Sequence, residues 1–142
     1  IAAKDGITAL KIQSSRMLLA YGFLRKVFEV FERYKTPIDM ITTSEVAVSL
    51  TIDDDSNLED ILKELNDFGS VEVDKDQTII CVVGDFLASK SGYAAKVFDS
   101  LKAIPIRMIS YGGSNNNVSV LVDSNLKKDA LIALHKGLFD LN

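Results

Sequence analysis

Two residues of the sequence have types and positions suited to ligand recognition, a glycine and an aspartate that flank one amphipathic segment. Gly22 precedes apolar residues at helical spacing, and the unpaired N–H groups and positive dipole end of such a helix suit a carboxylate. Asp39 interrupts the apolar run PIDMI (residues 37–41) and supplies a negative charge for an ammonium group. We expect Asp39 to start a strand beside that helix end.

The run around Asp39 returns later in the chain with its charge reversed. PIDMI at 37–41 recurs as PIRMI at 105–109, so that Arg107 takes the place of the aspartate. Two other pairs repeat in the same order: DSNL at 55–58 and 123–126, and glycine-aromatic segments at Gly22 and Gly92. Three repeated signals in one order indicate two copies of one module. The alternative for the two charges is that both simply face solvent.

Periodicity divides each copy into alternating strands and amphipathic helices. In the first copy we expect strand 7–13, helix 22–34, strands 38–43 and 46–52, a helix with a capping box of Ser56 and Glu59, and strand 71–73. In the second we expect strand 77–83, helix 92–102, strands 105–110 and 117–123, and helix 125–137. The order βαββαβ predicts an α+β fold of two ferredoxin-like modules, each with two helices on one face of an antiparallel sheet.

The second copy lacks a fourth strand after its last helix. A vacant strand position leaves an open sheet edge, which is prone to unwanted pairing. The apolar start Ile1-Ala2-Ala3 is the segment available to fill it. We therefore expect a first module at residues 5–75, inserted into a second module made of residues 76–142 and 1–4.

The composition argues against several classes of partner. The 142 residues are 47% hydrophobic and carry a net charge of −4, which disfavours a nucleic-acid binder. No apolar stretch approaches the ~20 residues of a membrane span. Cys81, the single cysteine, lies in an apolar strand and suits a reducing cytoplasm. The run Asp53-Asp54-Asp55 lacks the alternating spacing of a calcium loop, so no metal site is expected.

Longer strings around the same residues carry a family resemblance. Residues 17–28 read MLLAYGFLRKVF, residues 39–46 read DMITTSEV, and residues 106–112 read IRMISYG. Together they resemble the C-terminal regulatory region of aspartate kinase, especially the lysine-sensitive monofunctional type, over essentially the whole chain. The resemblance implies a pair of ACT domains, which are small-molecule sensors of ferredoxin-like fold.

That resemblance also implies a function. Aspartate kinase is a transferase that uses ATP to convert L-aspartate into 4-phospho-L-aspartate, the first step of the aspartate pathway of amino-acid biosynthesis. The ACT pair would bind lysine where the first modules of a homodimer meet, and would inhibit the kinase by feedback. The sequence has no Lys-Phe-Gly-Gly-type phosphate loop, so this chain is expected to sense and not to catalyse. ATP and Mg²⁺ would belong to an N-terminal kinase domain of the same protein, and no cofactor is expected here.

By position, the family's effector pocket maps onto the first module. The residues implied are Met17, Ala20, Gly22, Phe23, Leu24, Pro37, Ile38, Asp39, Thr43, Ser44 and Glu45. Leu19, Ala20 and Pro37 replace a histidine and two serines of the lysine-sensitive pattern, which removes side-chain hydrogen bonds. Arg107 would repel an ammonium group, so the second module is expected to have a structural or coupling role.

Three alternatives remain open at this point. The chain could sense another amino acid, such as threonine. It could be a small ferredoxin-like enzyme of the acylphosphatase type, for which Arg16 follows the first strand but without a glycine-rich phosphate loop. It could also be a dimerisation module with a degenerate pocket.

Overall fold

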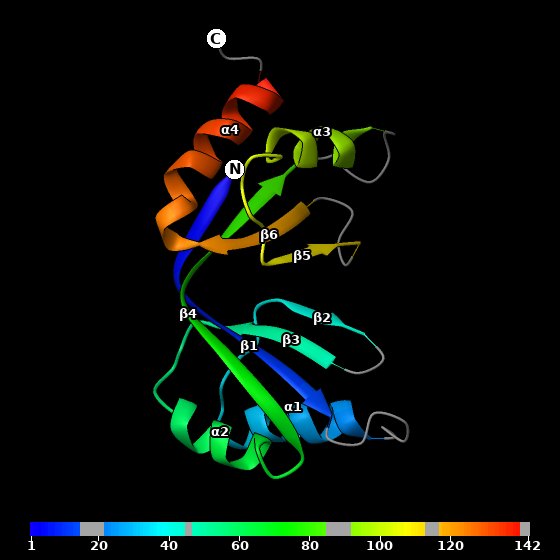
Figure 1. The fold of residues 1–142 in the computed structure, drawn as a ribbon, viewed down its shortest axis with the longest axis vertical. Helices are drawn as coiled ribbons and strands as arrows, with labels where there is room; N and C mark the ends of the chain where they lie inside the picture. The colour runs from blue at the N-terminus through cyan, green and yellow to red at the C-terminus, as the bar shows by residue number, and fades with distance from the viewer. Residues whose placement is uncertain (15–21, 45–46, 85–91, 113–116, 140–142) are drawn as a thin grey trace. The chain divides into compact units, whose positions relative to one another are not determined.

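The computed structural model describes residues 1–14, 22–44, 47–84, 92–112 and 117–139 (Figure 1). The strands are β1 (Ala2–Ser14), β2 (Ile41–Thr43), β3 (Ala47–Ile52), β4 (Gly69–Val83), β5 (Met108–Tyr111) and β6 (Asn117–Asp123). The helices are α1 (Phe23–Arg33), α2 (Leu58–Leu65), α3 (Tyr93–Ser100), the short 3-10 helix η1 (Ser124–Leu126) and α4 (Lys127–Phe139). The chain divides into two compact units, Gly6–Lys75 and Ile1–Asp5 with Asp76–Asn142.

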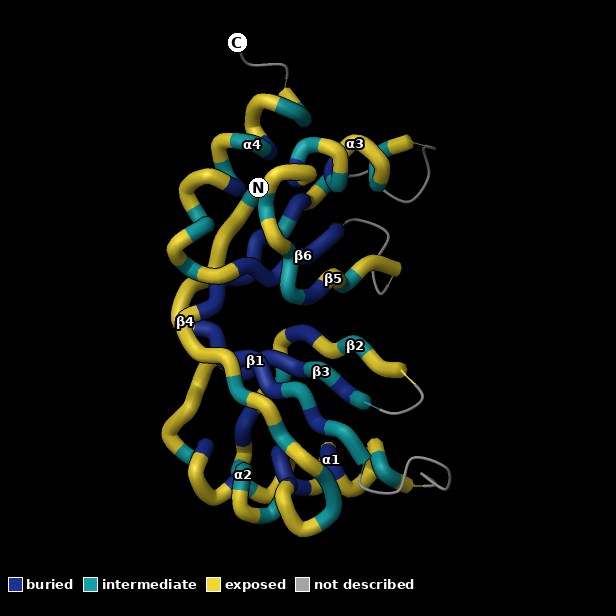
Figure 2. Tube along the Cα trace, viewed as in Figure 1, coloured by how far each residue is buried: buried dark blue, intermediate teal, exposed yellow. Residues whose placement is uncertain are grey.

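The first module, Gly6–Lys75, has the strand order β2-β3-β1-β4 with α1 and α2 packed on it. Both β1 and β2 pair with β3 in antiparallel fashion. Its core combines Leu10 and Ile12 of β1 with Phe31 of α1 and Leu65 of α2. The buried stripe of each helix faces these strands (Figure 2), as its apolar spacing predicts.

The second module repeats this plan with the order β5-β6-β4-β1. Val82 of β4 faces Val118 of β6, and both pack with Val97 of α3 and Leu134 of α4. The fourth strand position is taken by the beginning of β1, and Ile1 packs against this second core. The predicted fold of two ferredoxin-like modules, the second completed by N-terminal residues, is confirmed.

Asp5 ties the N-terminal segment into the second module. Its Oδ1 accepts a hydrogen bond from the Thr78 hydroxyl at 3.0 Å, and its Oδ2 lies 2.8 Å from Lys127 Nζ. The hydrogen bond from Lys127, followed by that from Thr78, holds the pKa of the Asp5 carboxyl below its usual value. These contacts join β1, β4 and the start of α4. The N-terminal part of β1 is therefore held in the second module by an ion pair as well as by its place in the sheet.

The long strands β1 and β4 each pass from one module to the other. The sequence predicted separate strands at 71–73 and 77–83, whereas β4 is continuous from Gly69 to Val83. At the points of passage Gly6 has φ 70° and Asp76 has φ 57°. These left-handed conformations suit glycine and, less often, aspartate.

The predicted capping box at the start of α2 is wrong. The N-cap residue is Asn57, and it makes no side-chain capping bond. The Ser56 hydroxyl instead donates to Asp54 Oδ1 at 2.7 Å, and the Asn57 amide donates to the Tyr34 carbonyl at 3.1 Å. Both side chains are thus engaged by the turn before α2 and by the end of α1.

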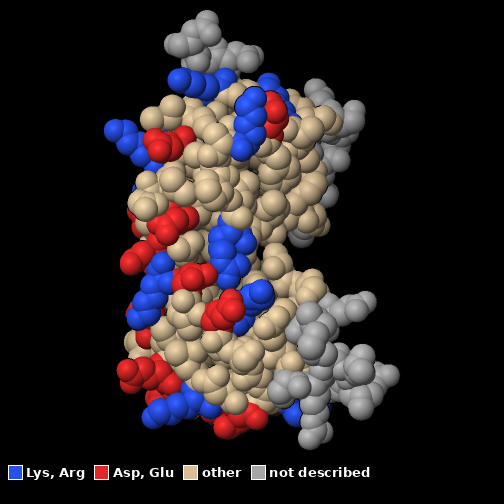
Figure 3. All heavy atoms as spheres, viewed as in Figure 1, with Lys and Arg blue, Asp and Glu red and all other residues tan. Residues whose placement is uncertain are grey.

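Within the described segments, no helix combines the length and apolar character needed to cross a membrane. On the face drawn in Figure 3, acidic and basic side chains are interspersed and do not form a continuous basic surface. That face offers no broad electrostatic footprint of the kind that phosphate backbones require.

Candidate functional site

The N-terminus of α1 is set by Gly22. This residue has φ 77° and ψ 4°, a left-handed conformation in which a side chain would be strained. Among the described residues no side chain caps the helix, and its first turn has no acidic residue. Within this part of the chain the backbone N–H groups of that turn have no side-chain capping partner, and they present a partial positive charge that suits a carboxylate ligand.

Asp39 is held at the entrance to β2 by Thr51 of β3. The Asp39 N–H donates to the Thr51 carbonyl at 2.9 Å, and the Thr51 N–H donates to the Met40 carbonyl at 3.0 Å. The Met40 N–H donates to the Thr51 hydroxyl at 2.9 Å in a buried position. Two residues thus face one across the strands, a bulge-like arrangement of the kind that can re-aim a side chain. Asp39 itself is exposed.

The sequence suggested that Asp39 lies beside the start of α1. Within one module, the structure shows that it does not. In Figure 1, α1 begins on the side of the first module where β1 and β2 end. Asp39 precedes β2, four residues before Thr43, which corresponds to ~13 Å along an extended strand. The N–H groups at the start of α1 and the Asp39 carboxylate therefore lie toward opposite ends of β2.

The other predicted site residues fall into three groups. Gly22, Leu24, Pro37, Asp39, Thr43 and Ser44 are exposed. Phe23 and Ile38 are half-buried and pack against the first core, so part of each side chain has a structural role. Met17, Ala20 and Glu45 lie outside the described residues, as does Arg16 of the acylphosphatase alternative.

Three large apolar side chains of α1 and of the edge strand β2 are exposed. Leu24 and Phe28 lie one turn apart on α1 and are 42% and 41% exposed. Ile41 of β2 is 37% exposed and pairs with Leu50, whose side chain belongs to the core beneath the helices. Ile41 therefore points to the helix side of the sheet. From the sequence, Leu24 was expected in the effector pocket, whereas Phe28 and Ile41 were predicted only as parts of a helix and a strand, because β2 was not identified as an edge strand.

The second copy has the same backbone plan without the acid. Gly92 has φ 92° at the start of α3, and Arg107 N–H donates to the Leu121 carbonyl at 2.8 Å. Leu121 stands where the first module has Thr51, so no hydroxyl accepts the Met108 N–H and β5 begins at Met108. The Thr51 hydroxyl is a feature of the site that the sequence analysis missed. The sequence signal that could have revealed it is the difference between the two copies, which have a threonine and a leucine at this position.

Comparison with known proteins assigns the family. A model of the ACT domain matches residues 80–138. The aspartokinase of Schizosaccharomyces pombe is 36% identical over 145 residues, covering 99% of this chain and 28% of that protein. A solved structure from Porphyromonas gingivalis W83, assigned to a C-terminal regulatory domain of aspartate kinase, is 58% identical with a TM-score of 0.89, and the alignment covers 97% of this chain and 95% of that one. The chain belongs to the aspartate kinase family.

Within this family the chain is a regulatory ACT region of aspartate kinase. Aspartokinase III of Escherichia coli, solved with lysine and aspartate in its T-state, is 36% identical with a TM-score of 0.86 over 97% of this chain. The chain spans about a third of that protein, and 28% of the fission yeast aspartokinase. The matched part is the regulatory domain, and the catalytic domain of aspartate kinase is not covered.

Proposed function

We propose that this aspartate kinase region binds free lysine at the edge of the first module, and that binding inhibits a kinase domain of the same protein by feedback. The observation that carries the proposal is an α1 N-terminus that no described side chain caps, combined with an Asp39 backbone N–H that donates to the Thr51 carbonyl. The second copy has Arg107 and Leu121 at the corresponding positions. A lysine zwitterion supplies the complementary carboxylate and ammonium groups.

A homodimer brings the two ends of the proposed site together. β2 is an edge strand of the sheet, and antiparallel pairing of two β2 strands about a two-fold axis reverses the direction of one against the other. Asp39 of one subunit then approaches the end of the other subunit's β2, beside which the other α1 begins. The exposed apolar side chains of Leu24, Phe28 and Ile41 would be buried in the same contact.

The effect on a kinase domain follows from this geometry. A ligand that touches both subunits favours the relative rotation of the two first modules that gives it the most contacts. Couplings of ~1–3 kcal/mol are typical, and they change affinity by ~5- to 150-fold. The second module, with Arg107 in place of the acid, would transmit the rotation.

Calorimetric titration of the full chain with lysine tests the proposal. Asp39→Asn should weaken lysine binding at least ~10-fold, because a charge-assisted bond is lost. Arg107→Gln changes the matching residue of the second copy and should leave the affinity within about two-fold. Lysine binding that is unaffected by Asp39→Asn would overturn the assignment, and a preference for threonine would change the ligand but keep the site.

Mixing subunits tests whether the site is shared. Gly22→Val should disable the α1 N-terminus, since valine is strained at φ 77°. Each homodimer, Asp39→Asn or Gly22→Val, then has two defective sites, whereas a mixed dimer has one intact site. Recovery of lysine binding on mixing supports a site between subunits. Absence of recovery in mixed dimers verified by mass spectrometry refutes it.

A further inference from the structure

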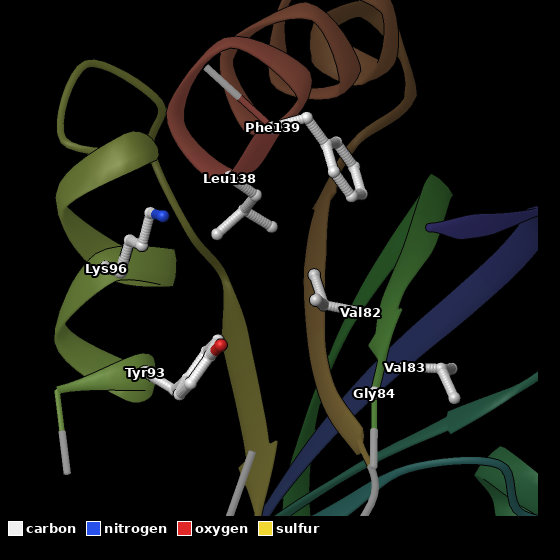
Figure 4. A pocket seen from close by; sticks show the side chains of 7 residues that line it. All are labelled: Val82, Val83, Gly84, Tyr93, Lys96, Leu138 and Phe139. Atoms are coloured by element: carbon white, nitrogen blue, oxygen red, sulfur yellow. The ribbon is translucent and has the colours of Figure 1, made fainter. Parts of the chain in front are cut away.

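A pocket of about 220 Å³ lies within the second module and shares no residue with the proposed lysine site (Figure 4). Tyr93 and Lys96 of α3 line one side, and Leu138 and Phe139 of α4 line another. At the end of β4, the Val82 side chain points into the pocket, whereas that of Val83 points away from it (Figure 4). The pocket thus combines apolar and aromatic walls with one ammonium group.

The first module shows what can occupy this position in the fold. Phe23 and Lys26 correspond to Tyr93 and Lys96, because each pair follows its N-cap glycine by one and four residues. In the first module the Phe68 ring lies near both. Its centroid is 6.1 Å from that of Phe23 in an edge-to-face arrangement, and Lys26 Nζ lies 6.0 Å from its centre.

The second module leaves the corresponding space open to a ligand. α2 ends at Leu65 and Phe68 follows in the turn, whereas α4 remains helical to Phe139. Leu138 and Phe139 line the pocket from α4 and leave the 220 Å³ open (Figure 4). Among the described residues, the Lys96 ammonium makes no ion pair.

We propose that this pocket binds a small aromatic carboxylate, with its ring beside Tyr93 and its acid group at Lys96. An enclosed cavity of ~150 Å³ accommodates benzene, so the volume suits one ring with a short acidic arm. A lysine beside an aromatic ring gains a cation–π attraction, and its ammonium forms a charge-assisted bond with a carboxylate. The ring of the bound ligand would make the contacts in the second module that the Phe68 ring makes in the first.

The test is a titration of the full chain with phenylacetate, followed by backbone amide NMR. The amides of Gly84, Tyr93 and Lys96 should shift in a saturable way, and benzyl alcohol, which lacks the charge, should bind more weakly. Lysine titrated separately should not shift them, so this site succeeds or fails independently of the proposed lysine sensor. A concentration of about 20 mM phenylacetate is enough to detect binding with a Kd in the millimolar range. If these amides do not shift at that concentration, the proposal is overturned.

Two matched variants identify the ammonium group responsible. Lys96→Met keeps most of the apolar stem and should weaken phenylacetate binding about 5- to 10-fold. Lys26→Met makes the same change in the first module and should leave the affinity for phenylacetate unchanged. Equal effects of the two lysine variants contradict the assignment.

Discussion

Replacing Gly137 by alanine tests how closely α3 and α4 pack. A Cβ at this position would lie 1.8 Å from Ser100 Oγ and 2.6 Å from Ser100 Cβ. Rotating the hydroxyl away would lose its 2.7 Å hydrogen bond to the Lys96 carbonyl and still leave the Cβ contact, so the helices must separate. Overfilling costs ~1–3 kcal/mol, and the 2.6 Å approach to Ser100 Cβ places this site at ~2–3 kcal/mol, whereas glycine to alanine within a helix gains ~1 kcal/mol. We expect the free energy of unfolding to fall by ~1–2 kcal/mol.

Urea denaturation and thermal melting followed by circular dichroism measure the loss, which should lower Tm by about 3–6 °C. Ser100→Gly provides the control, because it leaves Ser100 Cα, at 3.3 Å, as the nearest atom to the new methyl group. In a double-mutant cycle the two changes should couple by at least ~1 kcal/mol in the favourable direction. A Gly137→Ala chain that is as stable as the wild type, or a coupling near zero, would refute close packing at this point.

Two further changes test the anchoring of the modules. Thr51→Val removes the acceptor of the buried Met40 N–H, so the free energy of unfolding measured in urea should fall by ~1–2 kcal/mol. The affinity for lysine should fall as well. If both values are unchanged, the hydroxyl does not hold the Asp39 segment in place. Because the folded pKa of Asp5 is lowered by Lys127 and Thr78, its carboxylate stabilises the fold above the unfolded pKa of ~3.9, and this contribution is lost as pH falls through the folded pKa. The Tm difference between wild type and Asp5→Asn should therefore shrink below about pH 4, and a constant difference from about pH 3 to 7 would contradict this linkage.

The internal repeat made most of the fold predictable from the sequence. Helix 22–34 is found as Phe23–Arg33, and strand 117–123 has the predicted bounds, because both have a clear period and glycine or polar residues at their ends. The N-terminal residues completing the second sheet could be inferred from the missing strand. Strand 38–43 is shorter than predicted, since the Thr51 hydroxyl takes the Met40 N–H and regular pairing begins at Ile41.

The candidate site was less predictable, for two physical reasons. Asp39 was expected beside the start of α1, but the direction of α1 carries the chain to the opposite end of the module before β2 begins (Figure 1). Long-range contacts such as that of Thr51 to Met40 have no local sequence signal. The pocket beside Lys96 escaped notice because it depends on α4 continuing as a helix, where the first copy ends its helix and inserts Phe68.

The passage of β1 between the modules has a consequence for synthesis on the ribosome. Residues 6–75 form a contiguous module that can fold as soon as it emerges. Residues 1–5 leave the ribosome before this module, yet their partners in the second half of β4 and the lysine that pairs with Asp5 come much later. The segment must therefore stay available, neither degraded nor wrongly paired, until the start of α4 has been made.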